Sequence, residues 1–564
     1  MNDFLSNRKR TTVTSRSVQQ LTDTRWVYLA LAVMVALSLI PIWLFDYFPS
    51  QDGPVHINSV SVLNDYQDNA LYQRFYTEQW QLTANQAFFA LYALLARVLP
   101  LELVQNLILS LYIIATPLAV LAALRLAGGS PYAALLVMPA LYSLVLYMGF
   151  FSFCLSLGVF ALVLGLYFYY VKRPSWQRAV MLAASLYGLY LLHPLAALWA
   201  MVLIALYTLT DVLKTRHWRK TWVMLACLAP TALTIIGFWL AKSIRLAKFT
   251  GSVTETSGAD ELALGFIKSL VSNPLTPLQK LNYLLDSLTF TPAWLTAVYY
   301  LVLGVLSFLA VRSLRRSATL AQRSVFVGAG MMVLVMLLAP ERLDEFGWLP
   351  ARLLPLVIIS LVMALGSVSL PRQVWRVAGV AALVITSLSL FYRLPAHAGF
   401  AETIEQYRSA SEVLEPNSVF LPINFDVFYN DEERQEARLR PEFLPLQHAA
   451  SYLLLDKPLV NLRNYQASKP YFPLRHRLSH DPATALSPDD QLSSFHGAPL
   501  HLDLERFEAR TGETLDYVLI WGTPENPNSP DIVDFFEQLA AGYNLSTTID
   551  GDETMRVYER AASE

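Results

Sequence analysis

An aspartate and a histidine stand four residues apart, directly after the first long apolar stretch of the sequence. That stretch, residues 26–45, is long enough to predict a membrane span, and Gln51-Asp52-Gly53-Pro54-Val55-His56 follows it. Ionisable groups at a membrane boundary indicate function. Gly53-Pro54 predicts a tight turn that fixes the direction of the Asp52 carboxylate. Such a carboxylate could take a proton from a hydroxyl or amine, or share a divalent cation such as Mg²⁺ or Mn²⁺ with His56.

A structural role competes with this interpretation of Asp52. Aspartate followed by glycine and proline is also typical of a helix start, where the carboxylate caps the backbone N–H groups of the first turn. The two roles are not exclusive. We therefore take Asp52 as the first candidate for a general base and keep helix capping as the alternative.

Basic residues near predicted span ends form a second group of candidates. Arginine suits phosphate because its planar fork matches the phosphate oxygens. Arg352 opens a late apolar stretch, and Arg342 lies in the charged run Glu341-Arg342-Leu343-Asp344-Glu345. Lys242, Arg245 and Lys248 are spaced to share one helical face. The alternatives are snorkelling for Arg352, a solvated ion pair for Arg342 and an interfacial anchor for the lysine-rich set.

Histidine and tyrosine provide the remaining candidates. His193 precedes Pro194 at a break between two apolar runs, so it is either a polar break or a site residue. His448, and Tyr465 within residues 461–472, belong to a region that mixes aromatic rings with amides and cations. Such a surface suits sugar binding, because rings stack on sugars and amides reach hydroxyls. A loop folded onto the rest of the protein is the alternative.

The composition requires a membrane protein. Of 564 residues, 54% are hydrophobic and only 15% are charged, against roughly 25% charged in soluble domains. Both cysteines, Cys154 and Cys227, lie in apolar runs, which argues against a disulfide framework. The apolar runs predict about eleven transmembrane helices, at residues 26–45, 103–124, 132–148, 150–171, 176–192, 194–213, 221–241, 292–311, 324–339, 353–370 and 374–392.

The distribution of charge predicts the orientation in the membrane. Residues 393–564 hold 14 Lys and Arg against 28 Asp and Glu, a net charge of −14, whereas residues 1–392 carry +12. Every short basic loop falls on one side if the apolar run 84–99 lies along the surface and does not span. We therefore expect a cytoplasmic tail (1–25), a multi-span domain (26–392) whose first outer loop is 46–102, and an extracytoplasmic domain (393–564). Nothing in this pattern suggests nucleic-acid binding.

The C-terminal region has the signals of a small α/β domain. Residues 402–414 have helical spacing, whereas residues 418–422 and 516–522 favour strands. A helix is predicted at 531–541, with Ser529 as its N-cap and Pro530 at its first position. Asp550-Gly551-Asp552 predicts a hairpin between strands at 544–549 and 555–560.

The layout resembles the GT-C glycosyltransferases, in particular the bacterial protein mannosyltransferases and lipid A aminoarabinose transferases. The similar segments are Ser50-Gln51-Asp52-Gly53-Pro54, the helix at residues 85–95, and Arg352-Leu353-Leu354-Pro355. Two departures stand out. Gly53 occupies the position where the family often has a second acid, and Asn85-Gln86-Ala87-Phe88-Phe89 replaces a Lys-Pro-Pro-Leu-Tyr pattern, so donor contacts of that lysine cannot be carried over.

The resemblance implies an inverting transferase in the bacterial inner membrane. Its donor would be a sugar on a polyprenyl phosphate, and its acceptor a glycan, lipid or protein on the outer face. Asp52 would deprotonate the acceptor while arginine holds the departing phosphate. Two other interpretations stay open. One is a non-enzymatic polysaccharide or lipid export or assembly protein, although spans nearly free of charge argue against ion-coupled transport. The other is an enzyme similar to an O-antigen ligase or polymerase.

Overall fold

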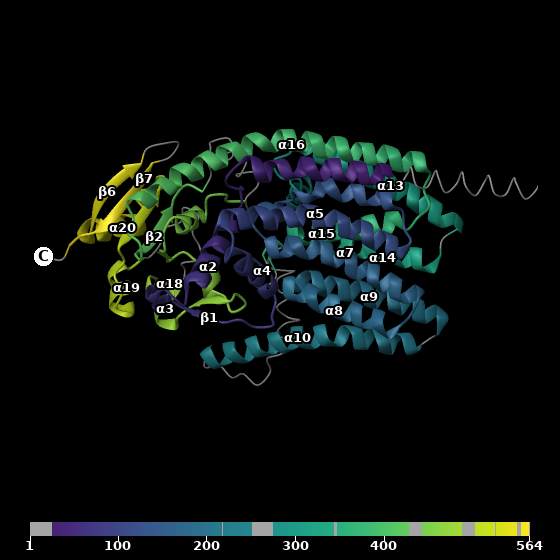
Figure 1. Ribbon diagram of the computed structural model, residues 1–564, viewed down its shortest axis with the longest axis horizontal. Coiled ribbons are helices and arrows are strands. Elements are labelled where there is room, and N and C mark those ends of the chain that lie inside the picture. Colours follow the sequence, from purple (N-terminus) through teal and green to yellow (C-terminus); the bar gives the residue numbers. More distant parts are fainter. Residues whose placement is uncertain are drawn as a thin grey trace, which may run out of the picture.

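Long apolar helices packed side by side form most of the molecule (Figure 1). The computed structural model describes residues 25–564 apart from 217, 251–274, 318, 343–346, 428–442, 488–501, 525, 550–553 and 563–564. In this described part, nine helices are long and apolar enough to span a membrane: Arg25–Leu44, α5 (Leu101–Ala127), α7 (Phe151–Lys172), α9 (Pro194–Thr215), α10 (Trp218–Thr250), α13 (Ala293–Ser317), α14 (Leu320–Leu338), α15 (Leu349–Gly366) and α16 (Arg372–Arg408). The predicted multi-span class is confirmed.

Two of the predicted spans have a different form. The run 176–192 is helix α8 (Trp176–Leu192), which at 17 residues is roughly 25 Å long, short for a bilayer core. The run 132–148 is the 3-10 helix η1 (Pro131–Leu141) followed by the short α6 (Leu144–Tyr147). Pro139 inside η1 lacks a backbone donor. Tyrosines of neighbouring helices bond the carbonyls here: Tyr112 donates to Leu141 O and Tyr299 to Leu136 O, each at 2.8 Å.

The first outer loop is folded into short elements. They are α2 (Gly53–Asp65), α3 (Ala70–Phe75), strand β1 (Tyr76–Glu78) and α4 (Gln86–Ala96). Helix α4 has 11 residues and is roughly 16 Å long, about half the thickness of a bilayer core. This length agrees with the prediction that the apolar run 84–99 does not span.

Helix α16 connects the membrane helices to the C-terminal domain. It has 37 residues, and Figure 1 shows it running along the helical bundle and on to the strands. The predicted domain boundary between residues 392 and 393 therefore falls inside one continuous helix. The helical pattern at 402–414 is the outer end of α16 together with the 3-10 helix η2 (Ser409–Glu412).

A mixed five-stranded sheet forms the centre of the C-terminal domain, as predicted. Its order is β3 (Val460–Asn461), β2 (Val419–Asn424), β5 (Tyr517–Trp521), β7 (Met555–Arg560) and β6 (Tyr543–Ile549). Strand β2 is parallel to β3 and β5, whereas β7 is antiparallel to β5 and β6. Helix α20 (Pro530–Gly542) starts at Ser529, although the serine side chain makes no capping bond.

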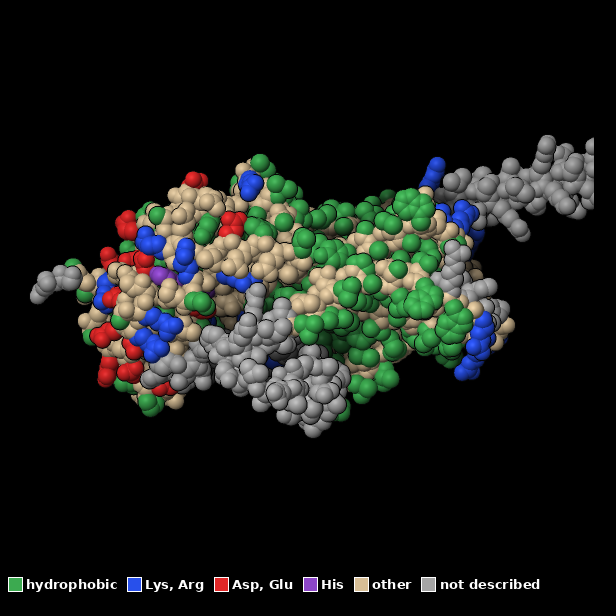
Figure 2. Space-filling model, turned by 90° about the horizontal axis from the view of Figure 1, so that it is seen from below, with side chains coloured by type: hydrophobic (Ala, Val, Ile, Leu, Met, Phe, Trp, Pro, Cys, Tyr) green, Lys and Arg blue, Asp and Glu red, His purple; other side chains and the backbone are tan. Residues whose placement is uncertain are grey.

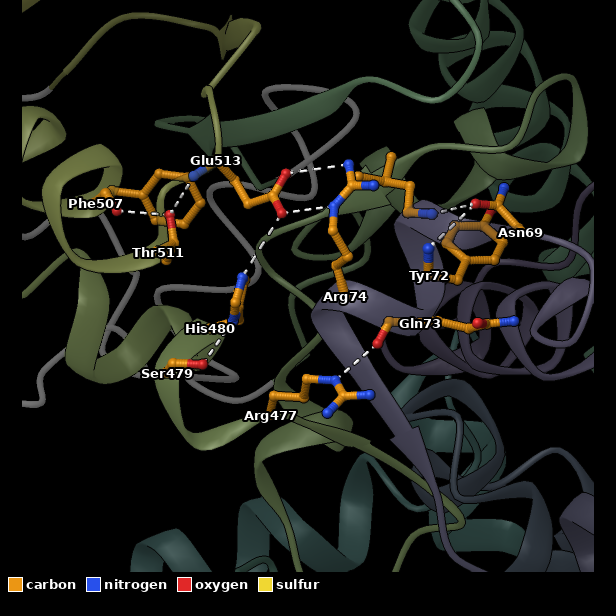
Figure 3. Close-up of polar contacts among 11 residues, drawn as sticks. Asn69, Tyr72, Gln73, Arg74, Arg477, Ser479, His480, Phe507, Thr511 and Glu513 are labelled. Atoms are coloured by element: carbon orange, nitrogen blue, oxygen red, sulfur yellow. Dashed lines mark hydrogen bonds and ion pairs between the residues drawn. The ribbon is translucent and has the colours of Figure 1, made fainter.

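The first outer loop and the C-terminal domain are joined by a set of contacts that we call the outer clasp. Strand β1 pairs antiparallel with β4 (Leu474–His476). Figure 3 shows the side chains beside this pair: Arg74 of α3 binds both carboxylate oxygens of Glu513, and Arg477 Nε donates to the Gln73 carbonyl at 2.7 Å. His480 Nε2 lies 3.9 Å from Glu513. The clasp ties the middle of the loop to residues 474–477, a few positions after Tyr465 and Gln466, and to Glu513.

Charge separates along the molecule. Figure 2 shows hydrophobic side chains over the helical part, while the acidic side chains of this face gather at the end formed by the C-terminal domain. Together with the sheet, this distribution matches the predicted fold class, a polytopic helical membrane domain followed by an α/β domain.

Candidate active site

The loop that carries Asp52 is held by backbone hydrogen bonds to the turn before α7. Gln51 N donates to Tyr147 O at 2.9 Å, and Asp52 N donates to Met148 O at 3.2 Å. Asp52 is the N-cap residue of α2, but its side chain makes no capping hydrogen bond. The capping interpretation is therefore wrong for the carboxylate, which instead lines a cavity.

Two glycines allow this close approach. Gly149 has a φ of +78°, a conformation that L side chains rarely adopt, and a Cβ there would lie 2.5 Å from Gly53 N. A Cβ on Gly53 would lie 2.1 Å from Ser50 Oγ and 3.1 Å from Phe151 Cζ. A second acid at position 53 would therefore have no room. The break at Gly149 between two apolar runs was the sequence signal for this turn.

Two rings from the C-terminal domain contact the Asp52 carboxylate. Tyr465 donates its hydroxyl to Oδ2 at 2.8 Å, and His448 Nε2 lies 3.7 Å from Oδ1. The two rings stack with their centroids 5.1 Å apart. Burial raises the pKa of Asp52 to about 7, although the Tyr465 hydrogen bond and the Arg352 charge both act to lower it. A carboxyl with this pKa can exchange a proton near neutral pH.

His56 connects three parts of the site. Its Nε2 donates to the Gly149 carbonyl at 2.9 Å, and its Nδ1 accepts from Gln466 at 3.1 Å. Burial lowers its pKa to about 4, so the ring is neutral at physiological pH. Because Gln466 follows Tyr465 directly, this pair of hydrogen bonds fixes the position of the tyrosine that contacts Asp52.

The same hydrogen bonds bear on the metal hypothesis. A histidine binds a metal through a free lone pair on a ring nitrogen, and both nitrogens of His56 are already engaged. Within the described residues, no group of three or more His, Cys, Asp or Glu side chains is arranged to hold a metal ion. With both ring nitrogens engaged, His56 does not fit the role of a ligand for a cation shared with Asp52.

Arg352 brings a cation to the same cavity. Its guanidinium carbon lies 3.9 Å from the centroid of the Phe150 ring, and its Nη1 lies 3.5 Å from His193 Nε2. Among the described residues, Nε has no hydrogen-bond partner and no carboxylate lies within ion-pair distance. A largely buried guanidinium in this state is arranged to receive an anion.

The cavity has about 1100 Å³ of space not filled by atoms, including its open mouth. Its polar lining includes Asp52, His56, His193, Arg352, Tyr465 and Gln466. Aromatic rings cover much of the rest, with Phe88 and Phe89 from α4 and Tyr471 and Phe472 from the C-terminal domain. Ile235 and Phe238 of α10 extend the lining into a membrane-spanning helix. The lining of the cavity thus combines polar side chains, Asp52 among them, with apolar side chains of a membrane-spanning helix.

The structure brings together most of the side chains singled out in the sequence. One cavity is lined by Asp52, His56, His193, Arg352 and Tyr465. His448 is not among its lining residues, but its Nε2 lies 3.7 Å from Asp52 Oδ1. Arg342 is exposed and is not among the lining residues of this cavity, so its phosphate contact stays a prediction. The side chains of Lys242, Arg245 and Lys248 lie outside the described ones, although their backbone belongs to α10. Gln466 and Tyr471 were not singled out individually, because amides and tyrosines are common in loops.

The overall fold of this chain is similar to that of one solved membrane protein. A crystal structure of ArnT from Cupriavidus metallidurans, bound to undecaprenyl phosphate, matches with a TM-score of 0.54 over 95% of this chain and 98% of that chain. The identity is 12%, so the similarity defines the fold alone. No protein-family model matches the sequence, and no curated protein matches it significantly.

Proposed function

We propose that this protein is a glycosyltransferase that moves a sugar from a polyprenyl-phosphate donor to an acceptor at the outer face of the inner membrane. One observation carries the proposal: a carboxyl with a pKa of about 7 and a guanidinium whose Nε has no hydrogen-bond partner among the described residues line the same cavity, which also has apolar side chains from a membrane-spanning helix. The GT-C fold is consistent with this role, and the matching ArnT structure holds undecaprenyl phosphate.

In the proposed reaction Asp52 is the general base. It takes the proton of an acceptor hydroxyl or amine, the freed electron pair attacks the anomeric carbon, and the bond to the lipid phosphate breaks on the opposite side. A single displacement of this kind inverts the configuration at that carbon. General-base catalysis contributes typically about 10²–10⁴-fold to a rate.

Arg352 is the proposed phosphate ligand. Its Phe150 stack and its contact with His193 hold the guanidinium in place, leaving hydrogen-bond donors for phosphate oxygens. Ile235 and Phe238 are suited to the first isoprene units of the donor because they are apolar and belong to a spanning helix. The cavity thereby provides for both ends of an amphipathic lipid donor.

The orientation also belongs to the proposal. The basic loops and the −14 charge of residues 393–564 favour a cytoplasmic N-terminus and an extracytoplasmic C-terminal domain. An alkaline phosphatase reporter fused after Glu564 should therefore be active, since it folds only outside the cytoplasm. An inactive phosphatase together with an active cytoplasmic reporter at the same position would reverse the orientation and move the site to the cytoplasmic face.

Binding of undecaprenyl phosphate tests the phosphate site without knowledge of the sugar. The full chain in lipid nanodiscs should bind this lipid, and Arg352→Gln should weaken binding roughly ten- to a hundredfold, the equivalent of about 1.5–3 kcal/mol for a charged hydrogen bond. Arg342→Gln is the matched control because Arg342 is exposed and outside the cavity. Equal affinity of the unchanged protein and Arg352→Gln would contradict the role of Arg352, and no binding by either would contradict the proposed donor.

A further inference from the structure

Asp52 faces the substrate cavity on one side and the C-terminal domain on the other. During the proposed reaction the carboxyl receives a proton, which it must lose before the next turnover. Asp52 is only 7% exposed, and the donor and acceptor would fill the cavity beside it. A route that stays open while substrates are bound would pass through one of the groups that contact Asp52 from the C-terminal domain or from α2.

Among the described side chains that contact Asp52, one has the chemistry to carry a proton onward. Tyr465 already donates its hydroxyl to Asp52, and burial with the Asp52 charge raises its pKa well above the ordinary value, so it holds its own proton. His56 has both nitrogens in hydrogen bonds and a pKa lowered to about 4. His448 remains, with Nε2 3.7 Å from Asp52 Oδ1. Such contacts in empty sites are often long and tighten when substrate binds.

His448 also lines a second, smaller hollow inside the C-terminal domain. The hollow has about 300 Å³ of space not filled by atoms, open solvent included, which leaves room for about one water, and its polar lining includes Asn424, Gln447, Asn461 and Arg463. Asn424 ends β2 and Asn461 ends β3, and crevices form at the carboxyl ends of such parallel strands. Asn424, Gln447 and Arg463 are partly exposed, so the hollow lies close to the protein surface.

The hollow is suited to water. The Asn424 amide is fixed, since it donates to Leu446 O at 2.7 Å and accepts from Tyr407 at 2.9 Å. Gln447 Oε1 is buried and has no hydrogen-bond partner among the described residues. Buried polar atoms of this kind are usually satisfied by ordered water. A water here would stand on the far side of His448 from Asp52.

We infer that His448 relays the proton from Asp52 into this hollow. The inference rests on the proposed function. The acceptor O–H or N–H bond breaks as the acceptor joins the anomeric carbon, and the electron pair of the broken sugar–phosphate bond leaves with the polyprenyl phosphate. Asp52 holds the proton and passes it to Nε2 of neutral His448. The imidazolium then releases its Nδ1 proton to water. After the products leave, the ring returns to its starting tautomer by taking a proton from water at Nδ1 and losing the Nε2 proton to water in the emptied cavity.

Chemical rescue tests the relay. The full chain in nanodiscs is assayed for release of undecaprenyl phosphate from an undecaprenyl-phosphate-linked hexose and pentose. His448→Ala should lower turnover roughly 10²-fold, the scale of a lost proton transfer. Added imidazole should restore at least a tenth of the lost rate with a saturable dependence, whereas His448→Gln, which fills the site, should be slow and not rescued. His480→Ala is the control for non-specific effects of imidazole, because His480 lies in the outer clasp, on Glu513.

Each outcome has a separate meaning. If His448→Ala is slow and imidazole does not help while undecaprenyl phosphate still binds, His448 has a structural role and the relay is wrong. If His448→Gln is as active as the unchanged protein, the proton leaves by another route, for example with the lipid phosphate, and the relay is equally wrong. If the unchanged protein releases undecaprenyl phosphate from neither donor and does not bind undecaprenyl phosphate, the proposed function itself fails.

Discussion

At the scale of single residues, opposing effects set the pKa of Asp52. Burial disfavours the ionised carboxylate, whereas the tyrosine hydrogen bond and the arginine charge favour it. The balance leaves the pKa of Asp52 at about 7 and therefore leaves a carboxyl that can act as a base at neutral pH. An aspartate with the ordinary pKa of 3.8 would be ionised at neutral pH but would be a weaker base than Asp52.

This balance predicts a pH profile. A general base works only when deprotonated, so kcat/KM should fall as the pH drops through about 7 and level off above it. Tyr465→Phe removes a hydrogen bond that favours the carboxylate, which raises the pKa of Asp52 and should move the acid limb to higher pH. Tyr543→Phe is the control, because that hydroxyl donates to Leu515 O in the C-terminal domain. An acid limb that stays in place in Tyr465→Phe would contradict the assignment.

At the scale of elements, the turn before α7 holds the loop that carries Asp52. The turn before α7 and the loop before α2 share two backbone hydrogen bonds, and Gly149 is where their backbones come closest. The position of Asp52 is therefore set by backbone contacts and does not depend on a helix cap.

Gly149→Ala should disturb this contact. The left-handed conformation costs an alanine about 1–2 kcal/mol, and its Cβ would press on Gly53 N at 2.5 Å. We expect a lower unfolding temperature in detergent and a loss of turnover. Gly188→Ala in α8 is the matched control, since no atom lies within 4 Å of its added Cβ. Equal stability and activity for both variants would show that the close approach is unimportant.

At the scale of the whole molecule, the candidate active site is shared between two regions. Asp52 and Arg352 come from the membrane half of the chain, whereas Tyr465 and His448 come from the C-terminal domain. Helix α16 and the outer clasp hold these regions together. The C-terminal domain is thus part of the site and not an appendage.

A charge swap measures the contribution of the clasp. Arg74→Glu places a like charge opposite Glu513 and should lower the free energy of unfolding by at most about 1 kcal/mol, because the Arg74 side chain is 53% exposed. The double variant Arg74→Glu/Glu513→Arg should recover most of this loss. Thermal unfolding at low and high salt is the measurement. If the double variant is less stable than Arg74→Glu, the two side chains do not interact as a pair.

The sequence was most informative where local physics decides the structure. Apolar runs predicted the helices, and Asp550-Gly551-Asp552 between the runs 544–549 and 555–560 predicted the pairing of two strands. The 3-10 form of residues 131–141 could not be predicted, because tyrosines distant in sequence bond its carbonyls. Asp52 and Arg352 stood out because ionisable residues are rare at span ends, but nothing local predicted that Gln466 reaches His56 across 410 positions.

The central claim is that Asp52 is the general base, and one comparison tests it most directly. Asp52→Asn keeps the shape of the side chain, but the amide cannot take the proton from the hydroxyl or amine of the acceptor substrate. In nanodiscs we expect it to bind undecaprenyl phosphate about as well as the unchanged protein while releasing that lipid from undecaprenyl-phosphate-linked sugars at least roughly 10²-fold more slowly. Turnover by Asp52→Asn equal to that of the unchanged protein would contradict the account.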